Sequence, residues 1–197
     1  MRYLSFDIEA TGLEEKDLII EFAMVPFCAK TKKINHELEK HFYIKCPSFE
    51  ELKPNLNKWV IDHNKELIEK AHSDGITIES FKEELSKYLE SEEVKEYFGD
   101  KKITLFGKSM SAIDLPFLNR DLGWEFMRKY FEHRQLDLSC IAYGLIDMGF
   151  IPAECESGSK LMKYLKMGDV AHTALEDAVN TAIMYFKLLD LVSVKKA

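Results

Sequence analysis

The first part of the chain alternates apolar and polar positions with the two-residue period of β-strands. Residues 3–8, 18–27 and 41–46 are short apolar stretches separated by charged or turn-prone residues, so they predict three early strands in a meander. Residues 101–107 predict a fourth strand that ends in glycine, and residues 136–138 predict a short fifth strand. Strands therefore dominate the beginning of the chain.

Helical spacing takes over after residue 52. The stretch 52–73 is polar and helical in character, and apolar residues then recur at spacings of three and four between Ile78 and Leu89, as in an amphipathic helix. Further helices are predicted at 112–119, at 140–148 and from Ala174 onwards. This order of elements predicts an α/β or α+β sandwich around one mixed sheet.

The composition fits one globular domain that spans residues 1–197, with 46% hydrophobic and 31% charged residues. A chain of this length buries roughly 70% of the surface that its unfolded form exposes, so a full core can form. Acids at positions 7 and 9 interrupt the N-terminal apolar stretch, and no run of about 18 apolar residues occurs. We expect neither a signal peptide nor a membrane partner.

The charge balance limits the partners. The chain has 27 basic and 34 acidic residues, a net charge of -7, which is the wrong sign for a protein that grips long nucleic acid. Lys101 and Lys102 are interpreted as solvated residues rather than as a binding patch. The four cysteines lie far apart with no C-x-x-C pair, which argues against a zinc site and against disulfides and predicts a reduced, cytoplasmic location.

Two acids stand inside the first apolar strand. Asp7 and Glu9 are two residues apart, so the strand period sends both carboxylates to the same face of the sheet. Burying two anions there costs several kcal/mol unless a cation pairs with them, and a metal ion is the simplest partner. The alternative is an edge strand whose acids point into water.

The last helix begins with a polar group of residues. Thr173 followed by Glu176 is a capping box, which makes Thr173 the N-cap and Ala174 the first helical residue. His172 and Asp177 then occupy the two positions that meet across a helix entry, so we expect the imidazole and the carboxylate to lie side by side. The alternative is a solvated surface pair on a capped helix.

A third acid, Asp114, follows the fourth predicted strand and its glycine. It is flanked by Ile113 and Leu115, so it projects from an apolar context. By itself it is equally typical of an acid that the helix macrodipole stabilises near a helix N-terminus.

Together these segments resemble the three ordered motifs of the DEDDh exonucleases, the histidine branch of the DEDD superfamily. The segments are residues 6–13 (F-D-I-E-A-T-G-L), 113–118 (I-D-L-P-F-L) and 172–178 (H-T-A-L-E-D-A). Met110 stands where this family often has an asparagine, four residues before the middle aspartate. The resemblance implies an α/β, ribonuclease H-like fold with a mixed five-stranded sheet flanked by helices on both faces.

The resemblance also implies the chemistry of a metal-dependent 3′-to-5′ exonuclease that releases nucleoside 5′-monophosphates. Two divalent ions, Mg²⁺ or Mn²⁺, would be held by Asp7, Glu9, Asp114 and Asp177, with His172 as the general base. Carboxylate oxygens suit such hard cations, and a neutral imidazole can accept a proton near pH 7. Four carboxylates and two divalent ions balance in charge, which lets a phosphate enter an otherwise acidic protein.

Within this branch, residues 130–139 resemble the Y-F-H-Y-R-N-L-D-V-S stretch of oligoribonuclease, with His133 in place of a tyrosine that reaches the partner's site in a homodimer. The resemblance implies short single-stranded RNA or DNA oligonucleotides as substrates, a homodimer, and His133 as the trans-completing candidate. The implied substrate-binding residues are Ala10, Thr11, Leu13, Trp59, Ser109, Arg134 and Ser139. Plainer alternatives are packing for Trp59, an ion pair for Arg134 and a helix cap for Ser139.

Two other functions stay open. One is a proofreading or RNA-trimming exonuclease of the same branch that acts on longer single strands, which the acidic charge balance disfavours. The other is a catalytically silent nucleic-acid-binding module. The intact set of acids argues against it, because a binding module would gain stability by losing mutually repelling carboxylates.

Overall fold

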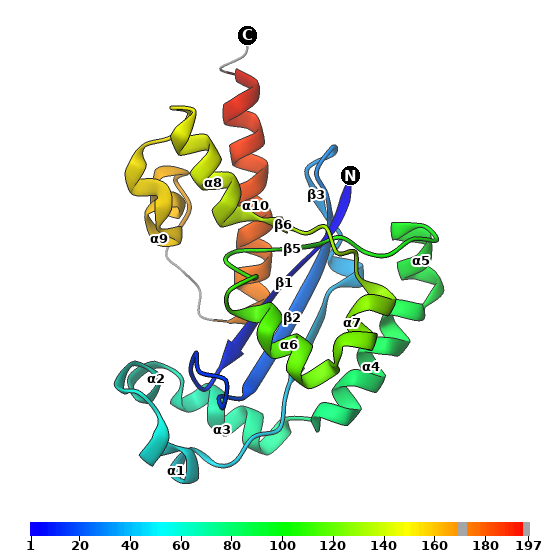
Figure 1. The fold of residues 1–197 in the computed structure, drawn as a ribbon, viewed down its shortest axis with the longest axis vertical. Helices are drawn as coiled ribbons and strands as arrows, with labels where there is room; N and C mark the ends of the chain where they lie inside the picture. The colour runs from blue at the N-terminus through cyan, green and yellow to red at the C-terminus, as the bar shows by residue number, and fades with distance from the viewer. Residues whose placement is uncertain (169–172, 195–197) are drawn as a thin grey trace.

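A six-stranded mixed sheet forms the centre of the computed structural model, which describes residues 1–168 and 173–194. The strands follow the order β3-β2-β1-β5-β6, and β4 also pairs with β2 (Figure 1). β2 is antiparallel to its three neighbours, whereas β1, β5 and β6 run parallel to one another. The strands are β1 (Arg2–Ala10), β2 (Ile19–Cys28), β3 (Lys33–Ile34), β4 (Lys40–Tyr43), β5 (Leu105–Gly107) and β6 (Leu136–Asp137).

The sheet has one strand more than the five that the sequence predicts. The additional strand, β3, contains two residues and follows a turn at Lys32, whose φ is 51°. A segment this short leaves no periodic pattern in the sequence. β5 is shorter than predicted, since Ile103 forms only an isolated bridge to Phe131 before the strand begins. The predicted α/β class and the mixed sheet are confirmed.

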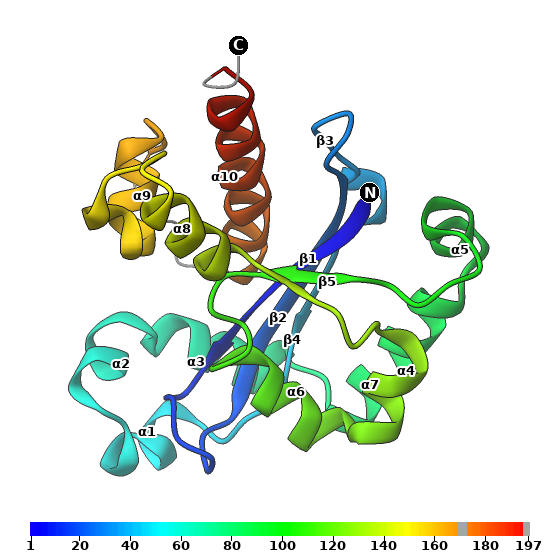
Figure 2. The ribbon, with the colours of Figure 1, turned by 45° about the horizontal axis from the view of Figure 1, so that its top comes forward.

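Helices cover both faces of the sheet and one of its ends (Figures 1 and 2). Short 3₁₀ segments join them at His36–Leu38, Lys53–Asn55 and Ala153–Glu156. The α-helices are α1 (Phe49–Leu52), α2 (Lys58–His63), α3 (Lys65–Asp74), α4 (Ile78–Glu90), α5 (Glu92–Phe98), α6 (Asp114–Leu122), α7 (Trp124–Tyr130), α8 (Leu138–Asp147), α9 (Gly158–Tyr164) and α10 (Ala174–Val194).

The side chains of β1 alternate between two hydrophobic cores. Leu4, Phe6 and Ile8 belong to a core that α4–α7 complete, whereas Tyr3 packs on the other face with α8, α9 and α10. A third, smaller core lies under α1–α3 around Ile20 of β2. Because successive strand residues point to opposite faces, the odd-numbered residues of β1 face α10.

α10 is fixed on this second face by its own cap and by a buried hydrogen bond. The Ser5 hydroxyl donates to the Ala178 carbonyl at 2.7 Å. The Glu176 amide donates to the Thr173 hydroxyl at 3.4 Å, as the predicted cap requires. These contacts place the first turn of α10 beside the carboxyl-terminal half of β1.

Two general expectations can be compared with the described ranges. None of the helices in them is both long and apolar enough to cross a membrane. Cys28, Cys46, Cys140 and Cys155 are all free thiols, as the sequence predicts.

Candidate active site

Three carboxylates meet between β1 and α10. Asp7 and Glu9 come from β1, and Asp177 comes from the first turn of α10. One oxygen from each of the three side chains lies within 4.8 Å of the others. The strand period and the cap at Thr173 explain the convergence, because they direct all three carboxylates into the same space. We call these three residues the acidic cluster.

Asp114 reaches the same strand from α6. Its Oδ1 accepts a hydrogen bond of 3.2 Å from the Ile8 amide, and its side chain is buried. The Leu4 amide bonds Thr104 on the β5 side, so the amides of even-numbered β1 residues point towards β5. β5 ends at Gly107, so the Ile8 amide donates to the Asp114 side chain rather than to a strand carbonyl. The middle acid is therefore held where the sheet loses a strand.

These carboxyl groups titrate far from their ordinary range. Burial, and then repulsion from Asp114, Asp177 and Glu9, raises the pKa of Asp7 well above its usual value. Burial raises the pKa of Glu9 to about 7, with further repulsion from Asp177 and Glu21. Burial also raises the pKa of Asp114 to about 7, although its hydrogen bond from Ile8 acts in the opposite direction. The positive charge near these carboxyl groups is therefore too small to offset the effect of burial on their ionised forms.

Lys108 is the cation that acts on these acids. It follows β5 directly, and its charge lowers the pKa of Asp7, Glu9 and Asp114, against the larger effect of burial. A single ammonium group does not offset the desolvation of several carboxylates. Lys108 was not among the residues predicted from the sequence, although its position directly after the fourth predicted strand was an available signal.

The donor set fits divalent metal ions. Hard cations such as Mg²⁺ and Mn²⁺ bind carboxylate oxygens, and the acidic cluster offers three of them within reach of one ion. The raised pKa values of Glu9 and Asp114 have the same meaning, because a bound cation would stabilise the charged forms that burial disfavours. The residues present therefore match a divalent metal site.

Glu21 supports the acidic cluster from the next strand. It is fully buried in β2 and is the register partner of Glu9. Its Oε2 accepts a hydrogen bond of 3.1 Å from the Ala174 amide, and its Oε1 contacts Nε2 of His41. Sequence reasoning missed this residue, although a lone glutamate inside the apolar stretch 18–27 was a visible signal.

Two of the predicted substrate-binding residues, both serines, lie together near the end of β5. The hydroxyls of Ser109 and Ser139 are 2.8 Å apart. Oδ1 of Asp137 accepts hydrogen bonds from both of their backbone amides, at 3.0 and 2.8 Å. Asp137 is therefore the organising residue of the pair, and it is also the N-cap of α8.

The loop after β1 is closely bonded within itself. The buried Thr11 hydroxyl accepts from the Leu18 amide at 2.9 Å, and its backbone amide donates to the Leu18 carbonyl. Ala10 follows a register shift and pairs with Ile19. A Cβ at Gly12 would lie 2.3 Å from the Asp17 carboxylate, so any other residue there would displace that carboxylate. The structure thus gives Thr11 a role in shaping the loop.

Leu13 stands at the tip of this loop and is 74% exposed. It lines a cavity of about 310 Å³ together with Ile113, Pro116 and Phe117 of the α6 region. Trp59 is also exposed, at 52%, and its ring stacks on His63 with the centroids 4.6 Å apart. Both side chains are accessible to a substrate.

The remaining predicted residues lie elsewhere. Arg134 lines a different cavity with Arg2, Lys101 and Lys102, so the structure does not bring it to the acidic cluster. Lys101 and Lys102 are exposed, as predicted. His133 is exposed, with Nδ1 3.5 Å from the Glu132 carboxylate. His172 lies outside the described residues.

The fold matches known nucleases. The nuclease domain of 3′hExo, described as a DEDDh family member bound to rAMP, gives a TM-score of 0.67 at 19% identity, covering 96% of this chain and 92% of that one. The cell-death related nuclease CRN-4 gives 0.69 at 17% identity, covering 96% and 64%. E. coli exonuclease I in complex with a dT13 oligonucleotide gives 0.67 at 16% identity, covering 96% and 41%. The chain thus spans less than two thirds of two of these proteins.

A family model described as Exonuclease, RNase_T, matches residues 4–185. No curated protein matches the chain. The structural likeness confirms the ribonuclease H-like fold. Because the family model covers nearly the whole sequence and contains the strand and helix that carry the acidic cluster, the chain belongs to the exonuclease family.

Proposed function

We propose that the protein is a metal-dependent 3′-to-5′ exonuclease that releases nucleoside 5′-monophosphates from short single-stranded oligonucleotides. The observation that carries this proposal is the convergence of Asp7, Glu9 and Asp177, whose carboxylate oxygens lie within 4.8 Å of one another. The family of the chain, the exonucleases, supports it. Relatives described as bound to rAMP and to dT13 support a nucleic-acid substrate.

We assign two divalent ions, Mg²⁺ or Mn²⁺, to the acidic cluster and Asp114. Such ions, when bound, activate water and stabilise the leaving oxygen in phosphodiester hydrolysis. Buried carboxylates with raised pKa values support the assignment, because they gain most from a cation.

The protein's own residues would bind and orient the substrate. His172, one position before the Thr173 cap, is assigned as the general base that accepts a proton from the attacking water. The Ser109 and Ser139 hydroxyls would donate to a phosphate, and exposed Leu13 would pack against the terminal base. These contacts would hold the last phosphodiester in line with the attacking water.

An end-labelling experiment tests the proposal. With Mg²⁺ present, an oligonucleotide labelled at its 3′ end should release labelled mononucleotide at once. An oligonucleotide labelled at its 5′ end should instead be shortened one nucleotide at a time. EDTA and Asp7→Asn should each abolish release. Asp147→Asn, at an exposed position of α8, is the matched control and should keep full activity. Release of internal fragments, or equal activity of Asp7→Asn, would overturn the assignment.

An exonuclease for longer single strands is the second candidate. The cavity lined by Arg2, Lys101, Lys102 and Arg134 favours it, since these cations could hold backbone phosphates beyond the reach of a dinucleotide. A ladder of RNA and DNA lengths separates the two candidates: the short-substrate enzyme is fastest on dinucleotides, and the strand processor is fastest on the longest substrates.

We also propose a cytoplasmic homodimer. Exposed His133 would then be the residue that approaches the partner's site. Light scattering of the wild type and of His133→Ala, together with cleavage rates, tests this. A monomer with unchanged activity contradicts it.

A further inference from the structure

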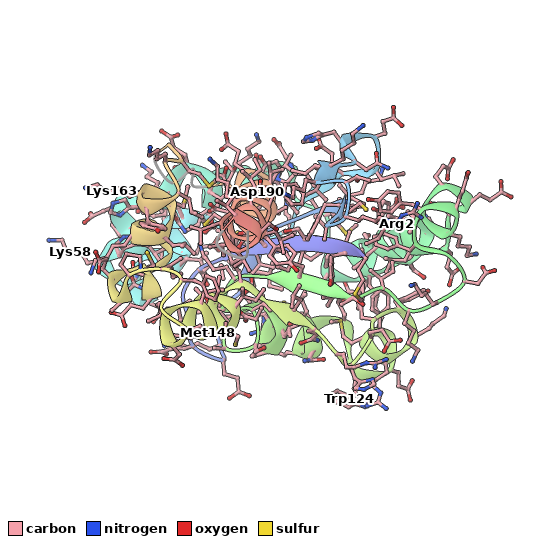
Figure 3. The ribbon with its side chains drawn as sticks, turned by 90° about the horizontal axis from the view of Figure 1, so that it is seen from above. Arg2, Lys58, Trp124, Met148, Lys163 and Asp190 are labelled. Carbon is pink, nitrogen blue, oxygen red and sulfur yellow. The ribbon has the colours of Figure 1, made fainter. Side chains whose placement is uncertain are left out.

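A cavity with a cationic rim lies at the other end of the sheet from the acidic cluster. Its volume is about 360 Å³, and Tyr3 contributes to its wall. Tyr3 precedes Asp7 by four residues in β1, which places the two backbones roughly 13 Å apart at about 3.3 Å per residue. Arg2, at the beginning of the same strand, lies across the molecule from Lys58 and Lys163 (Figure 3). We call this feature the cationic cavity.

Three separate segments supply its positive charges: Arg2 from the beginning of β1, Lys101 and Lys102 from the loop before β5, and Arg134 from the loop before β6. Their convergence follows from the parallel order of β1, β5 and β6, because the segments that precede parallel strands meet at one edge of the sheet. The charges are scattered in the sequence and adjacent in the fold.

Carboxylates do not neutralise these cations in the part of the chain that is described. The Arg2 guanidinium donates to the Tyr97 carbonyl and lies over the Tyr97 ring, 4.7 Å from its centroid. The Lys102 ammonium donates to the Arg128 carbonyl. Backbone carbonyls position these two side chains and leave their net charge in place.

Lys101 and Arg134 form no ion pair among the described residues, and both are exposed. Glu132 is the acidic residue that lines the cavity, and it lies next to His133. Four cations therefore face one carboxylate in a chain whose net charge is -7. Such a concentration of one sign attracts anions.

The apolar part of the cavity wall is formed by residues that pack mainly in the hydrophobic cores. Tyr3 and Phe98 are each 6% exposed, and Leu136 lies beside them. Thr104 and Gln135 add polar side chains to the lining. Cations spaced along a groove are how proteins hold the phosphate backbone of single-stranded nucleic acid without sequence preference. Because the chain belongs to the exonuclease family, a nucleic-acid strand is favoured over an acidic peptide as the anion that these cations bind.

We propose that the cationic cavity is a second binding site for single-stranded nucleic acid. Arg2, Lys101, Lys102 and Arg134 contact the backbone phosphates of the strand. This proposal rests on the proposed function in one respect: the ligand of the cationic cavity is the same strand whose 3′ end is degraded. A dinucleotide is too short to occupy the acidic cluster and the cationic cavity together, so the second site acts on longer strands.

The test compares two double variants of the full chain. Lys101→Ala/Arg134→Ala removes two cavity charges that make no hydrogen bond or ion pair in the described ranges, so it should melt like the wild type. Lys160→Ala/Lys163→Ala removes two exposed charges from α9, on the far side, and is the matched control. Binding of a labelled 12-mer is measured in EDTA over a range of salt concentrations, so that catalysis is absent.

We expect the cavity variant to bind the 12-mer more weakly and the control to bind like the wild type. Two lost phosphate contacts should make the slope of log K against log salt shallower by about 1.4. Equal affinity and equal slope for both variants would overturn the proposal. Competition by 5′-AMP or by a polyglutamate peptide as effective as that of the 12-mer would also overturn it, in favour of a nucleotide or an acidic-peptide site.

Cleavage measured separately distinguishes the two proposals. With Mg²⁺, the cavity variant should degrade a dinucleotide at the wild-type rate and the 12-mer more slowly. If the wild type degrades no oligonucleotide but the cavity variant still loses 12-mer affinity, the proposed function fails and the second binding site stands.

Discussion

Glu21 joins β2 to the first residue of α10: its buried Oε2 accepts a hydrogen bond of 3.1 Å from the Ala174 amide. Asp177 lies three residues further along this helix, so the bond fixes the third acid relative to the two on β1. The other carboxylate oxygen contacts His41, which ties β4 to the same point. Glu21 thus positions the acidic cluster without belonging to it.

Replacing Glu21 should damage both stability and metal binding. Glu21→Ala leaves the Ala174 amide without its acceptor, which we expect to lower the free energy of unfolding by about 1–3 kcal/mol. The displaced helix should also raise the Mg²⁺ concentration that gives half-maximal cleavage. Glu21→Gln keeps an oxygen for the amide and should recover most of both properties. Denaturant melts and Mg²⁺ titrations check this, and equal Mg²⁺ requirements for Ala and Gln would contradict the positioning role.

The raised pKa values predict how pH affects the metal-free protein. The pKa of Glu9 is 4.5 ordinarily and about 7 in the fold, and that of Asp114 also rises to about 7. Between these limits the folded state binds more protons than the unfolded state, so stability falls as pH rises from about 4.5 through 7. In EDTA, the Tm of the protein should therefore decline as pH rises from about 4.5 to about 7.

Divalent ions should reverse the decline. They bind the charged carboxylates of the folded state, so the increase in Tm on adding Mg²⁺ should be larger at pH 8 than at pH 5. Asp114→Asn removes one of the buried charges and should flatten the pH dependence in EDTA. Calorimetry across pH measures both effects. An equal Mg²⁺ effect at the two pH values would contradict this account.

We expect Lys108 to compete with metal ions for the acids. Its charge lowers the pKa of Asp7, Glu9 and Asp114. Lys108→Met removes this positive charge, so a bound metal ion should stabilise the carboxylates more than it does in the wild type. We expect half-maximal Mg²⁺ binding at a several-fold lower concentration, measured by calorimetric titration. Lys33→Met changes an exposed residue of β3, at the other end of the sheet, and as the control it should not change the titration. Weaker Mg²⁺ binding by Lys108→Met would show that the ammonium group supports the site rather than competes with metal.

Leu13 should affect substrate binding and leave the fold unchanged. Its side chain is 74% exposed beside the cavity that Phe117 lines, so Leu13→Ala costs little packing. Loss of the contact with a terminal base should cost about 1 kcal/mol, or roughly fivefold in KM. Trp124→Ala, which alters a side chain that is 63% exposed on α7, is the control. A changed Tm with unchanged KM would assign Leu13 to packing.

Much of the site could be predicted because its residues carry strong local signals. The two-residue period of β1 places Asp7 and Glu9 on one face, and the Thr173 cap places Asp177 at the beginning of α10. Charged residues within an apolar strand are rare enough to stand out.

The rest depends on contacts between distant segments. The role of Asp137 emerges only when the ends of β5 and β6 lie side by side, and β3 is too short to produce a pattern. The cationic cavity is assembled from three parts of the chain whose meeting depends on strand order. Glu21 is the exception, since a buried glutamate among apolar residues could have been noticed.

The alternation along β1 links correct folding to catalytic competence. Leu4, Phe6 and Ile8 fill one core while Asp7 and Glu9 face α10, so slipping the strand by a single position against β2 would exchange the two sets. Such an isomer would bury carboxylates in the larger core and place aromatic and aliphatic side chains where the acidic cluster now lies. A compact but inactive misaligned form is therefore too unstable to persist. The pairing of the first two strands thus ensures that a chain that folds also forms its acidic cluster.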